Sequence, residues 1–144
     1  MLWRKSYETG NTQVDDEHKE IFRMVESLVL NFDTTPTSEI EKTITFLAEY
    51  TVDHFVHEEA LMEESSYPGF DEHKKQHSDF VQEVVKLQER VNNRMNEALN
   101  SIDVKIVIAS WLVDHVLGSD KTMAQYYRKY VEEKEAEEAE EAKA

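Results

Sequence analysis

Histidine and carboxylate residues recur at helical spacing along this sequence, and both residue types are common metal ligands. His54 and Glu58 are four residues apart, as are His73 and His77, so each pair would lie on one face of an α-helix. The other histidines at such positions are His18 and His115. These six residues are the candidates for the chemistry of this protein.

Folding would bury these side chains, because they continue apolar stripes. His18 precedes Ile21 by three residues, and His115 follows Trp111 by four. A buried imidazole or carboxylate without a partner is destabilising. Metal binding removes this cost, since metals bind neutral imidazole and deprotonated carboxylate. The alternative is a core whose histidines are satisfied by the protein alone, but the repetition of the pattern on four segments favours a metal site.

The number of candidate ligands exceeds the needs of one ion, which indicates a dinuclear site with a second carboxylate. Asp120 lies five residues after His115, and on an ideal helix this spacing turns it away by about 140°. Gly118 and Ser119 lie between them, where a loosened or widened helix would turn Asp120 inward. Asp114 is expected on the surface. Imidazole and carboxylate ligands suit iron, manganese or zinc.

Four segments carry apolar residues at alternating steps of three and four, which predicts four amphipathic helices. The stripes are Ile21, Met24, Val25, Leu28, Val29 and Phe32; Ile40, Ile44, Leu47, Thr51, His54, Glu58 and Leu61; His73, His77, Phe80, Val84, Leu87 and Val91; and Val104, Ile108, Trp111 and His115. Thr37 or Ser38, with Glu41, predicts the cap of the second helix, and Ser101 that of the fourth. The sequence predicts an all-α, up-down-up-down four-helix bundle whose candidate ligands converge at one end.

Two flanking segments complete the predicted architecture. Residues 1–15 contain Trp3 and Tyr7 and are expected to form an arm packed on the helices. Residues 132–144 contain seven Glu, two Lys and no large apolar side chain, so they are expected to form an acidic, solvated extension. We therefore expect a bundle domain over residues 1–131 and an acidic tail over 132–144.

Composition excludes several classes of function. The net charge of −15 argues against nucleic acid and anionic membranes as partners, and the absence of cysteine excludes disulfides and thiolate chemistry. No apolar run approaches the roughly 20 residues that span a bilayer, and no export signal is visible. We expect a cytoplasmic protein without membrane insertion.

The combined motifs closely resemble the hemerythrin family, and its bacteriohemerythrin branch most of all. The matching segments are Val14-Asp15-Asp16-Glu17-His18, His54-Phe55-Val56-His57-Glu58-Glu59, His73 with His77, and Trp111-Leu112-Val113-Asp114-His115 with Asp120-Lys121. The resemblance runs from about Trp3 to Tyr130, and all seven ligand positions are filled.

The resemblance implies a non-haem di-iron site that binds O2 reversibly. His73, His77 and His115 would hold one iron, His18 and His54 the other, and Glu58 and Asp120 would bridge both. With an oxo or hydroxo bridge between two six-coordinate irons (Fe2+/Fe3+), a single position stays open, on the iron with two histidines. This count suits O2 carriage, storage or delivery.

Further positions follow from the same resemblance. Phe55, Trp111, Leu112 and Val116 would form an apolar wall around the open position. Met123 stands where many members of the family have a tyrosine near the pocket. His57 is not a ligand in the family pattern and is expected to be partly exposed or to contact a ligand.

Other functions are less consistent with the motifs. Ferritin-like di-iron oxidases use Glu-x-x-His on two helices, and no histidine here has Glu three residues earlier. The zincin motif His-Glu-x-x-His is also absent. A binding protein is therefore favoured over a di-iron oxidase or peroxidase. Sensing of O2, nitric oxide or iron remains an alternative, and a downstream oxygen-using enzyme is unidentified.

Overall fold

The computed structural model describes residues 3–92 and 105–143, and over these ranges the chain is helical without a β-strand. The elements are a 3₁₀ turn η1 (Lys5–Tyr7), helices α1 (Thr12–Asn31), α2 (Thr37–Glu64) and α3 (Phe70–Asn92), and a last helical run made of η2 (Lys105–Ala109), α5 (Ser110–His115), η3 (Val116–Asp120) and α6 (Lys121–Lys143). The expected cap Ser101 and the stripe residue Val104 lie outside the described residues.

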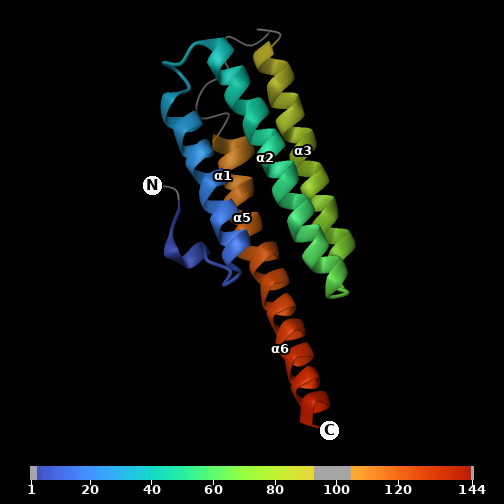
Figure 1. Ribbon diagram of the computed structural model, residues 1–144. Helices are drawn as coiled ribbons and strands as arrows, with labels where there is room; N and C mark the ends of the chain where they lie inside the picture. The colour runs from blue at the N-terminus through green and yellow to red at the C-terminus, as the bar shows by residue number, and fades with distance from the viewer. Residues whose placement is uncertain (1–2, 93–104, 144) are drawn as a thin grey trace.

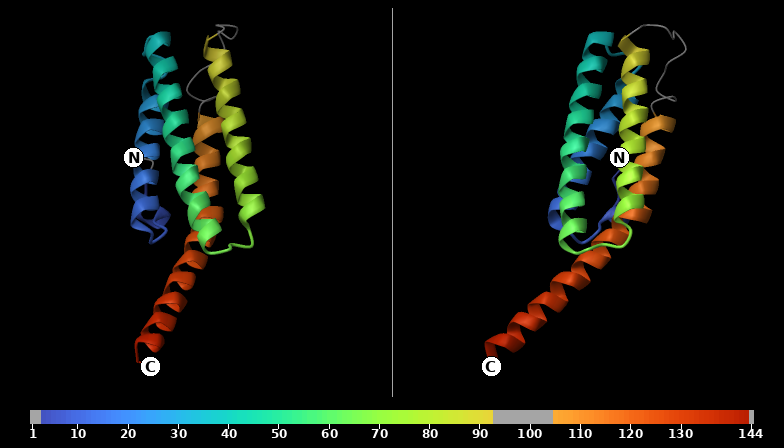
Figure 2. Two further views of the ribbon diagram at one scale, coloured as in Figure 1. Left: turned by 45° about the vertical axis from the view of Figure 1, so that its right-hand side comes forward. Right: turned by 90° about the vertical axis from the view of Figure 1, so that its right-hand side faces the viewer.

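The helices form the predicted antiparallel bundle (Figure 1). α2 packs against both α1 and α3, and η2 closes the ring by contacting α1 and α3. The turn between α2 and α3 lies at the same end of the bundle as the N-terminal arm and the start of α6 (Figure 2). This end therefore brings together the first turns of α1 and α3, the last turns of α2, and η3.

The predicted apolar stripes form the core. From α1 to α3 the buried set includes Ile21, Phe22, Val25, Ile44, Leu47, Phe80, Val84 and Leu87, and the last helix adds Ile108 and Leu112. The prediction differs at one position near the end of α2. Met62 is fully buried there, whereas Leu61 is only partly buried. Met62 lies one turn after the buried Glu58, so the stripe continues with a step of four.

α1 and α2 both begin at cap residues that the sequence pattern did not predict. Asn11 caps α1, because its side-chain oxygen accepts a hydrogen bond from the backbone N–H of Val14 at 3.1 Å. The predicted capping box of α2 was wrong. Pro36 occupies the N-cap position without a side-chain bond, and its carbonyl accepts from the N–H groups of Glu39 and Ile40.

The N-terminal arm is packed on the bundle, as predicted. Trp3, Tyr7 and Phe22 form a cluster of rings with centroids 5.3 to 5.7 Å apart. The buried Asp15 accepts hydrogen bonds from the backbone N–H groups of Thr9 and Gly10. Gly10 has φ +89°, a conformation that favours glycine, so the turn into α1 depends on this residue.

The last helix leaves the bundle after η3, and α6 projects away from it at an angle to α5 (Figures 1 and 2). Met123 and Ala124 are buried, whereas residues 132–143 are helical and exposed. No helix within residues 3–92 and 105–143 is long and apolar enough to cross a membrane.

Candidate metal centre

A π-helical turn places Asp120 beside His115. In η3 (Val116–Asp120) the helix is wider than an α-helix, because its hydrogen bonds join residues five apart. A spacing of five then completes about one turn, so both side chains face the bundle interior and are buried. This is the widening that Gly118 and Ser119 suggested in the sequence.

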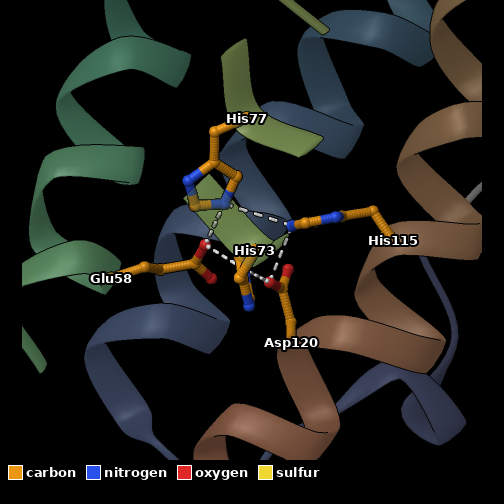
Figure 3. Close-up of side chains that lie close together, drawn as sticks. All are labelled: Glu58, His73, His77, His115 and Asp120. Atoms are coloured by element: carbon orange, nitrogen blue, oxygen red, sulfur yellow. Dashed lines mark hydrogen bonds and ion pairs between the residues drawn. The ribbon is translucent and has the colours of Figure 1, made fainter. Parts of the chain in front are cut away.

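Seven side chains predicted from the sequence converge at this end of the bundle. Their donor atoms form two overlapping groups, each within 4.8 Å, and both groups contain the two carboxylates. The first group is Glu58, His73, His77, His115 and Asp120, and the second is His18, His54, Glu58 and Asp120. Figure 3 shows the first group, in which the two carboxylates lie between the three imidazoles.

Each carboxylate presents one oxygen to each group of histidines. Asp120 Oδ1 lies 3.0 Å from His73 Nε2 and 2.9 Å from His115 Nε2, while its Oδ2 lies 2.9 Å from His18 Nε2. In Glu58, Oε1 is 3.0 Å from His77 Nε2 and Oε2 is 3.2 Å from His54 Nε2. This division of oxygens is the arrangement that two bridging carboxylates would need.

The contacts between these atoms are close, but most are not hydrogen bonds. The Nε2 atoms of His18, His54 and His73 and both oxygens of Glu58 and Asp120 are buried, and none has a correctly angled hydrogen-bond partner among the described residues. Nitrogen and oxygen atoms that approach one another without hydrogen-bond geometry suit a shared ion. The donor set therefore fits a pair of metal ions.

The outer nitrogens of three imidazoles are held by residues that sequence reasoning missed. His54 Nδ1 lies 3.0 Å from Glu17, His77 Nδ1 lies 3.1 Å from Glu59, and His115 Nδ1 lies 2.9 Å from Gln76. With Nε2 directed inward, each Nδ1–H donates to its side-chain oxygen, which fixes the tautomer and the ring orientation. The three partners are sequence neighbours of His18, Glu58 and His77, and this adjacency was the available signal.

Without metal, the same groups pair as acids and bases. Burial opposes charge on His54, yet Glu58 and the hydrogen bond to Glu17 raise its pKa to about 10. Burial likewise opposes charge on His73, but Asp120 and Glu58 raise its pKa to about 9. Burial would raise the pKa of Glu58, but His54 and His18 hold it well below its usual value. Protons therefore compete with metal for this site.

An apolar, aromatic wall borders one side of the centre. The ring of Phe55 stacks on His77 with centroids 3.8 Å apart, and Trp111 stacks on His115 at 4.4 Å. Leu112 and Val116 are buried on the same helical run. Of the four residues expected to form a pocket wall, Phe55 and Trp111 thus lie against imidazoles, while Leu112 and Val116 are buried on the helical run that carries His115.

The remaining residues named from the sequence occupy distinct places. His57 is 44% exposed, and its Nδ1 contacts the same Glu17 that holds His54. Met123 is buried, and Asp114 is exposed as expected.

Fold and donor set together define a helical bundle whose buried histidines and carboxylates can hold metal ions. Residues 9–127 match the family model described as the Hemerythrin HHE cation binding domain. The chain belongs to the hemerythrin family.

Individual relatives agree with this assignment. Bacteriohemerythrin from Methylococcus capsulatus is 36% identical over 122 residues, which are 84% of this chain and 92% of the relative. Myohemerythrin from Theromyzon tessulatum is 32% identical over 118 residues, covering 82% and 86% of the two chains. A crystal structure of wild-type hemerythrin superposes with a TM-score of 0.79 at 33% identity, covering 88% of this chain and 97% of that one.

Proposed function

We propose that this protein binds two iron ions and uses them to bind O2 reversibly, for carriage, storage or delivery. The observation that carries the proposal is the division of each carboxylate between two sets of histidines. A mononuclear site would need only one such set, whereas here Glu58 and Asp120 each face both. Membership of the hemerythrin family supports iron as the metal and O2 as the ligand.

In this proposal, His73, His77 and His115 hold one iron, and His18 and His54 hold the other. Glu58 and Asp120 would be the carboxylates shared by the two ions, and an oxo or hydroxo group would complete the pair. With this ligand set, a single coordination position would remain open on the iron with two histidines. Bound iron would supply the electrons that reversible O2 binding requires.

The chain itself would protect the bound gas. Phe55, Trp111, Leu112 and Val116 would form the apolar border of the open position, and the ring of Phe55 lies 6.0 Å from that of His54 as well as against His77. Side chains of this kind exclude water and protons from a site. Glu17, Glu59 and Gln76 would keep three ligand rings in place. Positioning the ligand rings and shielding the site are the roles that an O2 carrier needs from its protein.

The test is the absorption spectrum of the reduced protein before and after exposure to air, with the metal counted per chain. We expect two irons per chain and a visible band that appears with O2 and disappears when O2 is removed. One zinc per chain after iron-replete expression would overturn the di-iron assignment. Sustained O2 consumption with stoichiometric loss of an organic substrate would favour an oxidase instead.

A further inference from the structure

A surface cavity of about 280 Å³ lies beside the metal centre, with His73 in its lining. The turn before α3, the first turns of α3 and the wide η3 turn enclose it, and its lining residues are Tyr67, Gly69, Glu72, His73, Gln76, Gly118, Ser119 and Thr122. Glu72, Gly118 and Thr122 are exposed, whereas His73 is only 3% exposed. The cavity therefore leads from solvent to one of the proposed iron ligands.

Gly118 lies on the wall of this cavity, and no neighbouring atom requires a glycine at this position. A Cβ atom at this position would meet no other atom within 4 Å, and Gly118 does not have a positive φ. Glycine inside a helix costs about 0.5–1 kcal/mol relative to alanine. Its presence on the cavity wall is explained if an open cavity, or the freedom of the η3 backbone, is required for function.

His73 is the ligand whose ring is least restrained on this side. No described residue hydrogen-bonds to its Nδ1, in contrast to His54, His77 and His115. The Nδ1 of His18 also lacks such a partner, but His18 is fully buried and does not line the cavity. His73 lies in the first turn of α3, four residues after Gly69, and it is the ligand that both lines the cavity and lacks a hydrogen bond at Nδ1.

The lining is largely apolar, but it also carries oxygen atoms that a cation could use. Its oxygen-bearing groups are the Glu72 carboxylate and the hydroxyls of Tyr67, Ser119 and Thr122, whereas the Gln76 oxygen already accepts from His115 Nδ1 and Ser119 Oγ. Oxygen atoms of this kind can replace the water shell of a divalent ion. The aromatic border formed by Phe55 and Trp111 offers no such groups.

We propose that this cavity is the route by which Fe2+ enters and leaves the metal centre, with the His73 side chain as the residue that opens the inner end. The inference rests on the proposed di-iron function. It separates two paths: iron passes the cavity that carries the Glu72 carboxylate and the hydroxyl groups, and O2 passes the aromatic border.

The first test compares Gly118→Leu with Gly118→Ala in the iron-loaded full-length protein. Leucine would narrow the cavity, while alanine removes the glycine and adds only one methyl group. We expect release of iron to an excess of chelator, and anaerobic reloading with Fe2+ alone, to slow by at least about tenfold in Gly118→Leu, because a packed side chain must move before an ion passes. Gly118→Ala should stay within about twofold of the parent, since one methyl group leaves most of the volume open.

The second test concerns the charge at the cavity mouth and does not depend on a substitution in η3. Glu72→Gln removes a carboxylate from the lining, and Asp71→Asn removes one from the same helical turn outside it. We expect Fe2+ reloading to slow severalfold in Glu72→Gln at low salt only, because screening weakens charge attraction. Asp71→Asn should load at the rate of the parent.

The outcomes separate this inference from the proposed function. Final iron content of the parent tests the di-iron site, and the ratio of rates between variants tests the route. Equal rates in Gly118→Leu and the parent would overturn the route. Equal slowing in Gly118→Leu and Gly118→Ala would assign the effect to the η3 backbone and also overturn it.

Discussion

The two ends of the bundle use the same helical positions in different ways. At the end where α2 begins, its stripe consists of Ile40, Ile44 and Leu47, which pack into a continuous apolar core. At the other end the same stripe continues with His54 and Glu58, which are equally buried. Burial of the apolar residues stabilises the fold by itself. Burial of His54 and Glu58 stabilises it only when their nitrogen and oxygen atoms have hydrogen-bond or metal partners.

This difference assigns separate roles to the two ends. The apolar end supplies stability that does not depend on metal or pH. The donor end has buried oxygens and nitrogens aimed at one another, so its stability should follow the occupancy of the site. Leu112 and Thr51 lie where the two ends meet, and they allow the boundary to be tested.

The largest effect is expected from loss of a buried ligand at the donor end. His77→Ala removes an imidazole that faces Glu58 and stacks on Phe55, so it should lower iron content and the melting temperature strongly. His57→Ala is the matched control, because His57 is largely outside the centre and should leave two irons bound. Elemental analysis and thermal melts measure both, and two irons in both variants would contradict the ligand assignment.

The next largest effect compares a leucine beside the centre with one in the apolar end. Leu112→Ala and Leu87→Ala each remove a buried leucine and should each cost about 2–5 kcal/mol of unfolding free energy. Both variants should retain two irons, because neither residue is a ligand. Only Leu112→Ala should make the oxygenated form decay faster and admit azide more readily, since it opens space beside the site.

The measurement is the decay of the oxygenated spectrum at equal pH and temperature, with chemical denaturation for stability. Equal decay in Leu112→Ala and the parent at full iron content would show that Leu112 does not protect the site. Faster decay in Leu87→Ala would show that loosening of the bundle in general, rather than the local wall, controls the loss of O2.

The sequence predicted the donor end better than the details that support it. Ligand types at steps of three and four identify one helix face, and a bundle brings such faces together, so His18, Glu58 and His115 could be placed in advance. For Glu17, Glu59 and Gln76 the sequence offered only their adjacency to ligands, because they lie off these faces and reach the rings through side-chain conformations. The start of α2 was also missed, since Pro36 provides its cap through a backbone carbonyl.

A smaller effect is expected from pH on the metal-free protein. The pKa values of His54 and His73 are raised from 6.5 to about 10 and about 9, so their stabilisation is complete below pH 6.5 and is lost as the pH rises through these values. The pKa of Glu58 is lowered, so its stabilisation is present above its ordinary value of 4.5 and is lost in acid. The melting temperature of the metal-free protein should therefore be highest between pH 4.5 and pH 6.5, where both contributions are present.

The iron-loaded protein provides the control for this pH dependence, because both forms carry the same surface charges. Its imidazoles are held neutral by metal, so raising the pH removes competing protons instead of a stabilising charge. The melting temperature of the loaded form should therefore exceed that of the metal-free form by more at about pH 9 than at about pH 6, because only the metal-free form loses stabilisation as its histidines lose their protons. A metal-free protein that melts higher at the alkaline pH would contradict the pairing of these groups.

The smallest effect is expected at Thr51, where the apolar stripe of α2 meets the donors. Thr51 is 1% exposed, and its hydroxyl has no hydrogen-bond partner among the described residues. Thr51→Val replaces this hydroxyl by a methyl group at nearly equal helix propensity, so it should stabilise the protein by about 1 kcal/mol without changing iron content. Thr43→Val is the control, since Thr43 is only partly buried and its hydroxyl donates to the carbonyl of Glu39. Denaturant titration of both variants measures the difference, and destabilisation by Thr51→Val would show that this hydroxyl is satisfied and belongs to the donor end of the bundle.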